Sequence, residues 1–194
     1  MGAFSLCKRM YFCNMAEIFT NKVAESGIIS LDLASLIGNN EMLLFDIKPF
    51  LFMELILKEK DFRNALSSFD WSIYKNKVVG IYCSVDAIIP MWANMLIVSG
   101  LQPFAHSIYF GDETKTRDQF LLDQIALINP NDYLDQRVVI KGCGETPINE
   151  SAYVSITHKL RPVVKSIMYG EPCSTVPVYK RKDQYKIDSA VTKP

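Results

Sequence analysis

The sequence lacks a net charge, because its 21 Lys and Arg residues balance its 21 Asp and Glu residues over 194 positions. A neutral chain has no broad electrostatic field to attract nucleic acid or anionic lipid, so we expect neither as a partner. Hydrophobic residues make up 49% of the chain and charged residues 22%, with nine Gly and nine Pro. These fractions exclude a disordered, a collagen-like and a disulfide-dense chain. The composition indicates a globular protein with a core of its own.

No hydrophobic run is long enough to cross a membrane as a helix. The two longest apolar stretches, residues 50–57 and 87–98, are each interrupted by polar residues or Pro. Both fall short of the roughly 20 residues that a membrane-spanning helix needs, so we expect no membrane partner. We interpret both stretches as core, and with them Met91 and Met95, which are spaced as on one helix face.

The first residues contain no continuous apolar segment of an export signal, because Lys8 and Arg9 interrupt it. We therefore expect a cytoplasmic protein, in which the five Cys stay thiols or bind metal rather than form structural disulfides. We interpret residues 1–14 as an N-terminal extension, because the chain from Met15 is a more natural opening. Residues 15–181 are predicted to form a single α/β domain, and residues 182–194 a flexible polar tail.

From residue 77 onward, short β-branched or aromatic runs alternate with helix-length segments. This alternation predicts an α/β fold with a mostly parallel sheet and helices on both faces, a Rossmann-like three-layer arrangement. Before it, residues 28–33 and 43–47 predict an N-terminal β-hairpin or antiparallel addition. No internal repeat is apparent. The spacing predicts strands at 77–83, 105–110, 137–141 and 163–169, and helices at 58–69, 88–99, 111–128 and 150–160.

Three Cys residues, Cys83, Cys143 and Cys173, lie where predicted strands end. The carboxyl ends of parallel strands in one sheet share an edge, and open α/β sheets bind ligands beyond that edge. The separations of 60 and 30 residues match whole strand-plus-helix units, so the spacing permits the three thiols to meet. Thiolates bind zinc and iron-sulfur clusters, and three of them leave one metal position open. We therefore expect a three-cysteine metal or cofactor site.

Polar side chains beside these Cys residues are candidates to support the site. Asp86 lies at the start of the predicted helix, where it supports the site or caps the helix. Glu145 and Glu171 lie on Gly-containing loops, where they act as acid, base or ligand unless they are simply solvated. Ser174 adds a hydroxyl to the loop that holds Cys173.

Several motifs of well-known chemistry are missing. The chain has no Gly-x-Gly-x-x-Gly, no Walker phosphate loop and no Gly-x-Ser-x-Gly elbow, which removes the usual nucleotide and serine-hydrolase functions. A Cys-x-x-Cys pair is also absent, which weakens the metal signal.

Longer stretches of the sequence resemble a known family. The segments YCSVDAIIPMWANML, VIKGCGETPINESAYV and KSIMYGEPCSTVPVYKR are similar to the bacterial family named domain of unknown function 2480, from about residue 15 to residue 181. The GEPCSTVP segment is the most specific part of this resemblance. The family has no established activity, so the resemblance implies no mechanism. It implies a link to iron-sulfur assembly proteins as partners.

Three hypotheses for the function stay open, and whether the chain is an enzyme stays open with them. In the first, Cys83, Cys143 and Cys173 hold zinc or an iron-sulfur cluster in a protein accessory to iron-sulfur assembly or sulfur transfer. In the second, one thiol is a nucleophile or persulfide carrier, with Cys173 ahead of Cys143. In the third, the chain is a non-catalytic ligand-binding or protein-interaction module with structural cysteines.

Overall fold

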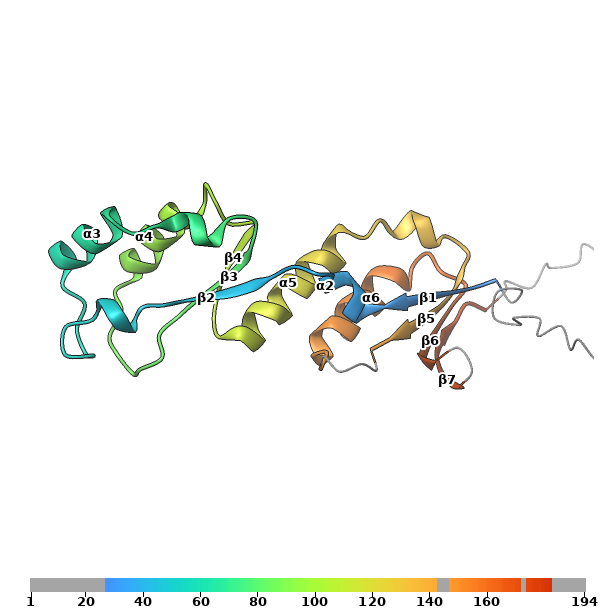
Figure 1. Cartoon of the computed structure of the whole chain (residues 1–194). Coiled ribbons are helices and arrows are strands. Elements are labelled where there is room, and N and C mark those ends of the chain that lie inside the picture. Colours follow the sequence, from blue (N-terminus) through green and yellow to red (C-terminus); the bar gives the residue numbers. More distant parts are fainter. Residues whose placement is uncertain (1–26, 143–146, 172–173, 183–194) are drawn as a thin grey trace, which may run out of the picture.

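The computed structural model describes residues 27–142, 147–171 and 174–182, and Figure 1 shows how their helices and strands follow one another. The strands are β1 (Ile28–Asp32), β2 (Met42–Asp46), β3 (Val78–Tyr82), β4 (Ser107–Phe110), β5 (Arg137–Lys141), β6 (Ser166–Glu171) and β7 (Ser174–Lys180). The α-helices are α2 (Leu33–Ile37), α3 (Glu59–Ser67), α4 (Met91–Leu101), α5 (Glu113–Leu127) and α6 (Glu150–Leu160). The short 3-10 helices are η1 (Lys48–Phe50), η2 (Trp71–Tyr74) and η3 (Pro130–Tyr133).

The strands form two sheets rather than one. A four-stranded sheet has the order β1-β5-β6-β7, and a three-stranded sheet has the order β2-β3-β4. All neighbouring strands are parallel except β6 and β7. The predicted α/β fold with mostly parallel sheets is confirmed. The prediction that all four strand ends share one edge is wrong, because β3 and β4 belong to one sheet and β5 and β6 to the other.

The predicted N-terminal hairpin is also wrong. Strand β1 pairs with β5 and strand β2 pairs with β3, each in parallel and in different sheets. Apolar-polar alternation shows that a strand is half-buried but does not specify which strand lies beside it. The antiparallel addition lies at the other end of the chain, where β7 pairs with β6. Pro177 fits there because β7 is an edge strand.

The two sheets are built on the same plan, which forms an internal repeat that the sequence pattern did not reveal. Corresponding elements of the two sheets start 59 residues apart. Strand β3 starts at Val78 and β5 at Arg137, and the same separation holds between α4 and α6 and between η2 and η3. The pairing register of the strands repeats as well. Val78 pairs with Met42 and Ser107, and its counterpart Arg137 pairs with Ile28 and Ser166. We call β2-α3-β3-α4-β4 the three-stranded unit and β1-α5-β5-α6-β6, with β7 added, the four-stranded unit. The three-stranded unit is thus inserted into the four-stranded one after β1 and α2.

The two units also repeat their cores. One core lies around the three-stranded sheet with α3 and α4, and the other joins the four-stranded sheet with α2, α5 and α6. Residues that correspond across the 59-residue repeat are buried in both cores. Examples are the pair Ala93 and Ala152 and the pair Ile97 and Ile156. Burying each Ile, Leu, Val or Phe side chain among these pairs contributes roughly 1.5–3 kcal/mol of hydrophobic stabilisation. Further buried pairs are Phe62 and Leu121, Leu66 and Ile125, Val79 and Val138, Ile81 and Ile140, and Leu101 and Leu160.

Helix α5 connects the two units, and Figure 1 shows it between the two sheets of an elongated molecule. Its first half packs on the face of the three-stranded sheet opposite α4, where the fully buried Thr116 meets Gly80. A Cβ atom at position 80 would lie 2.2 Å from the Thr116 Oγ1. The second half of α5 belongs to the core of the four-stranded unit. The lack of a side chain at Gly80 therefore allows one helix to serve both sheets.

Candidate functional site

The first strand of each unit ends with an aspartate, Asp46 in β2 and Asp32 in β1. At the end of β2, the Asp46 Oδ1 accepts hydrogen bonds from the Lys48 amide and from the Ser84 amide, each at 3.0 Å. Its Oδ2 accepts a hydrogen bond from the Ser84 hydroxyl at 2.6 Å. Burial raises the pKa of Asp46, but these hydrogen bonds and the charge of Lys48 outweigh it, so the pKa lies below its ordinary value. Asp46 thereby fixes the loop after β3 to the end of β2.

The four-stranded unit repeats part of this arrangement at Asp32. Its Oδ1 accepts a hydrogen bond from the Ala34 amide at 2.9 Å, as Asp46 does from the amide two residues on. At the same edge, Lys141 ends β5 and forms an ion pair of 2.8 Å with Glu171 at the end of β6. Because both side chains are partly exposed, this pair orders the strand ends more than it stabilises the fold.

Beside Cys83 lies a cavity of about 560 Å³ at the carboxyl end of the three-stranded sheet. The Asn94 side chain lines it, and among buried polar side-chain atoms of the described residues its Oδ1 alone has no hydrogen-bond partner. A buried acceptor without a donor costs about 1–3 kcal/mol. The other residues that line the cavity are Tyr82, Ala87, Ile89, Met91, Phe110, Gly111, Asp112 and Lys115.

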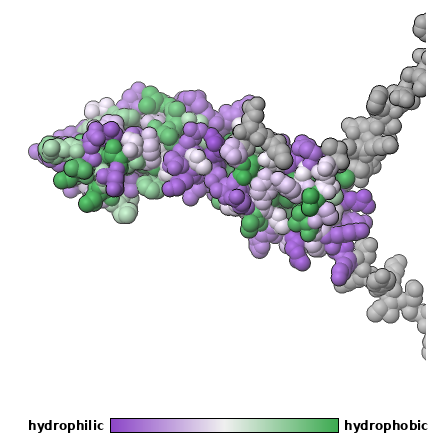
Figure 2. Space-filling view, turned by 90° about the horizontal axis from the view of Figure 1, so that it is seen from below, coloured by the Kyte–Doolittle hydropathy of each residue, from purple (hydrophilic) through white to green (hydrophobic). Residues whose placement is uncertain are grey.

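The cavity opens within a cluster of exposed apolar side chains that we call the end surface. Its eight members are between 48% and 86% exposed: Phe52, Met53, Leu55, Ile56, Ile88, Met91, Met95 and Phe110. Several of them are neighbours: Ile56 bridges to both Phe52 and Ile88, and Met91 and Phe110 line the same cavity. Figure 2 shows apolar side chains gathered over this part of the molecule. Residues 50–57 and 87–98 were predicted to be core, and for these members the prediction is wrong because the loops and the outer side of α4 face solvent.

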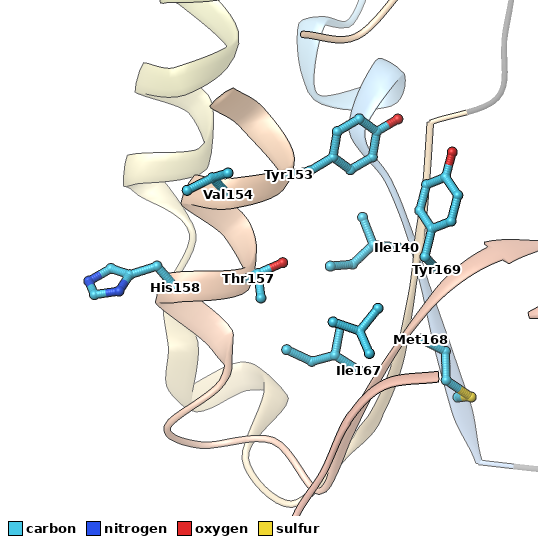
Figure 3. Close-up of a pocket in the computed structure, with 9 residues that line it drawn as sticks. Ile140, Tyr153, Val154, Thr157, His158, Ile167, Met168 and Tyr169 are labelled. Atoms are coloured by element: carbon cyan, nitrogen blue, oxygen red, sulfur yellow. The ribbon is translucent and has the colours of Figure 1, made fainter. Parts of the chain in front are cut away.

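A second cavity of about 600 Å³, the α6 groove, lies between α6 and strands β6 and β7. Figure 3 shows Ile140 and Ile167 facing this space from the sheet, and Thr157 from α6. The hydroxyls of Tyr153 and Tyr169 lie at one end of the groove, and the two rings meet edge to face with centroids 5.6 Å apart. The remaining residues that line it are Val154, His158, Met168 and Val178.

The structure places some of the predicted site residues and leaves others outside its described part. Cys83 is half-buried in the three-stranded unit, and Asp86 is exposed in the loop that follows it. Glu171 and Ser174 lie in β6 and β7 of the four-stranded unit. Cys143, Glu145 and Cys173 lie outside the described residues, so the three-cysteine site stays a prediction. No group of three metal-ligating side chains occurs within the described ranges.

The prediction that Cys83 and Asp86 lie at a helix start is wrong. Helix α4 begins only at Met91, with Pro90 as its N-cap and no capping side chain. Cys83 is therefore separated from the helix dipole by a loop, and Asp86 does not cap the helix. The alternation of apolar residues over 87–98 concealed this loop, because its Ile88 and Ile89 continue the apolar pattern of the helix.

Sequence comparison connects these features to a family. The family model described as "Protein of unknown function (DUF2480)" matches residues 17–181. The chain belongs to this DUF2480 family. The predicted resemblance is thereby confirmed over nearly the same range. No curated protein and no solved structure matches the DUF2480 chain. No helix in the described part of this DUF2480 protein is long and apolar enough to cross a membrane.

Sequence reasoning missed Asp46, Asn94 and the end surface. Asp46 could have been found, because it ends an apolar strand segment just as the chosen loop residues do. Asn94 and the end surface could not, because their importance depends on which side chains the fold leaves uncovered.

Proposed function

We propose that the protein is a non-catalytic protein-interaction module that assembles with a second copy of itself through the end surface. The observation that carries this proposal is the set of eight large apolar side chains that the loops after β2 and β3, the end of β4 and the outer side of α4 leave exposed. Monomeric soluble proteins rarely expose apolar patches of more than a few hundred Å². Contact with another protein removes such a surface from water.

The area of the end surface suits a protein partner. A fully exposed large side chain presents roughly 200 Å², so eight that are half exposed or more present on the order of 1,000 Å². A standard protein interface buries roughly 800 Å² on each partner. The patch is therefore large enough to form the centre of a stable interface.

The charges around the patch favour a second copy as the partner. Lys48 forms an ion pair of 3.3 Å with Glu54, and the Lys58 ammonium lies 3.3 Å from the centre of the Phe52 ring. Asp112 and Lys115 line the cavity beside Cys83. A rim with both signs of charge is self-complementary, and two copies of a neutral chain do not repel each other.

The cavity beside Cys83 supports the same proposal. Interfaces gain most of their binding energy where a projecting side chain enters a pocket of the partner. A cavity of about 560 Å³ in the middle of an apolar patch has the form of such a pocket. An N–H or O–H group that enters it can donate to the Asn94 Oδ1, which otherwise lacks a partner within the described structure. The proposal places this assembly in the cytoplasm, where Cys83 stays a thiol.

Sedimentation velocity on the full chain tests the proposal, with Met91→Glu as the disrupting variant. The repeat shows that Glu is compatible with this position, because Glu150 begins α6 where Met91 begins α4. Val154→Glu is the control, since it puts the same charge on an exposed apolar position of α6 outside the end surface, 69% exposed against 79% for Met91.

We expect a dimer for the wild type and for Val154→Glu at about 100 μM, and a monomer for Met91→Glu, because a charge in an apolar interface must be desolvated. A monomeric wild type at this concentration would overturn the proposal. Equal dissociation by both substitutions would also overturn it, because the interface would then not be the end surface.

A further inference from the structure

We propose that the α6 groove binds a neutral, mostly hydrocarbon small molecule that carries a hydroxyl or carbonyl group at one end. This site lies in the four-stranded unit and is separate from the end surface, so the proposal is independent of self-association. Its volume of about 600 Å³ falls in the range of small-molecule pockets, roughly 300–1,000 Å³.

The walls of the groove determine that the ligand is mostly hydrocarbon. Its floor is formed by Ile140 and Ile167, which are almost fully buried, and its sides by aliphatic residues such as Val154 and Val178. Removing apolar surface of both the ligand and the groove from water stabilises the complex.

The internal repeat provides a comparison within the same molecule. On α4, the corresponding side of the helix carries Asn94, Ser99 and Gln102 around a smaller cavity of about 470 Å³. Among the described residues, the three-stranded sheet has no strand that corresponds to β7. Strand β7 contributes Val178 to the wall of the α6 groove. The four-stranded unit thus differs from its counterpart by an added wall and a more apolar lining.

Two substitutions between the units place hydroxyls at one end of the groove. Tyr153 stands where the other unit has Asn94, and Tyr169 stands where it has Phe110. Phe110 shows that this strand position does not need a hydroxyl for packing. Figure 3 shows both tyrosine oxygens at the same end, which makes this end of the groove polar, and a phenol oxygen has two lone pairs beside its O–H, so it can take part in more than one hydrogen bond.

The described lining of the groove favours a neutral ligand. Among the described residues that line it, none is Lys, Arg, Asp or Glu, and His158 points away from the space in Figure 3. Bringing a charged group into such a lining without a countercharge carries a large desolvation cost. The groove should therefore discriminate between a neutral and a charged head on the same hydrocarbon chain.

Methyl NMR with 1-octanol as the probe tests the proposal on the full chain. The Ile140 and Ile167 methyls report on the groove, which both side chains face in Figure 3, while the Met91 and Met95 methyls report on the end surface. We expect 1-octanol to shift the Ile140 and Ile167 signals saturably with little effect on the two Met signals. Octanoate has the same chain length with a charged head, and we expect it to bind at least about tenfold more weakly.

Two variants of the four-stranded unit provide a matched pair. Val178→Glu puts a carboxylate at the wall of the groove, whereas Leu134→Glu puts it at a similarly exposed position, 54% against 53%, that does not line the groove. We expect the first to abolish the shift of the Ile140 and Ile167 signals and the second to keep it. Equal loss in both variants would overturn the proposal. If Val178→Glu does not fold, the wild-type comparison decides, since octanoate binding as tightly as 1-octanol, or shifts at Met91 and Met95 equal to those at Ile140 and Ile167, would overturn it.

Discussion

The Tyr153 hydroxyl lies against the backbone of Gly142, so that a Cβ atom at position 142 would be only 1.7 Å from the phenol oxygen. In the other unit the corresponding positions hold Cys83 and Asn94. The three-stranded unit thus combines Cys83 after the strand with Asn94 on the helix, whereas the four-stranded unit combines the smaller Gly142 with the larger Tyr153. Tyr153 lies against Gly142, whereas Cys83 and Asn94 line the cavity of the three-stranded unit.

This exchange predicts the effect of a substitution at position 142. Gly142→Ala should displace Tyr153 and lower the free energy of unfolding by about 1–3 kcal/mol, as expected for overpacking. Gly142→Ala combined with Tyr153→Asn imitates the three-stranded unit and should regain much of that loss. Urea denaturation measures both. If the second substitution only adds to the loss, the two residues do not compete for the same space.

The contact between Gly80 and Thr116 predicts a second coupled pair. Gly80→Ala places a Cβ atom 2.2 Å from the Thr116 Oγ1 and 3.0 Å from the Gly111 carbonyl oxygen. We expect a loss of about 1–3 kcal/mol, because the backbone of Gly111 can give little. Thr116→Ala should make the Gly80→Ala substitution less costly in a double-mutant cycle measured by thermal unfolding. Strict additivity of the two substitutions would contradict the packing of α5 on the three-stranded sheet.

Asp46 predicts a pH dependence of stability. Its pKa is lowered in the folded protein, so its contribution is present above the unfolded pKa and is lost as the pH falls through the folded pKa. We expect Asp46→Asn to lower the free energy of unfolding by about 1 kcal/mol at neutral pH, and the difference from wild type to shrink below about pH 4. Urea denaturation between neutral and acidic pH measures this difference. A difference that stays constant down to the acid limit would contradict an ionised Asp46 that accepts from Ser84.

Local elements were predictable from the sequence, whereas pairings between them were not. The strand at residues 137–141 and the helix at 150–160 were predicted with the bounds that the structure gives. The split into two sheets was not, because β1 pairs with β5 across more than 100 residues of chain and no local pattern encodes that contact. The internal repeat escaped notice because only scattered residues coincide, such as Pro103 with Pro162 and Gly111 with Gly170.

The candidate site was predictable only where it follows from strand ends. Cys83 and Glu171 do lie at such ends. The end surface was taken for core because an apolar residue such as Met91 carries the same signal in sequence whether a core or a partner covers it. Exposure depends on the tertiary arrangement, which periodicity does not report.

The two-sheet topology also leads to a prediction about metal. Cys83 directly follows β3 of the three-stranded sheet. Gly142 directly follows β5 and Ser174 begins β7, both in the four-stranded sheet, and they are the described residues next to Cys143 and Cys173 in sequence. We therefore expect Cys83→Ser to leave the iron and zinc content of anaerobically purified protein unchanged. Elemental analysis of wild type and variant measures this content. Loss of bound metal in the variant would contradict this expectation and support a shared thiolate site.

The central claim is that the end surface joins two copies, and small-angle X-ray scattering tests it most directly. Figure 1 shows the two units one after the other along the molecule, with the loops of the end surface at the extremity formed by the three-stranded unit. Two copies joined there lie end to end. We predict a dimer whose maximum dimension approaches twice that of the Met91→Glu monomer. A monomeric wild type, or a dimer hardly longer than the monomer, would contradict the claim.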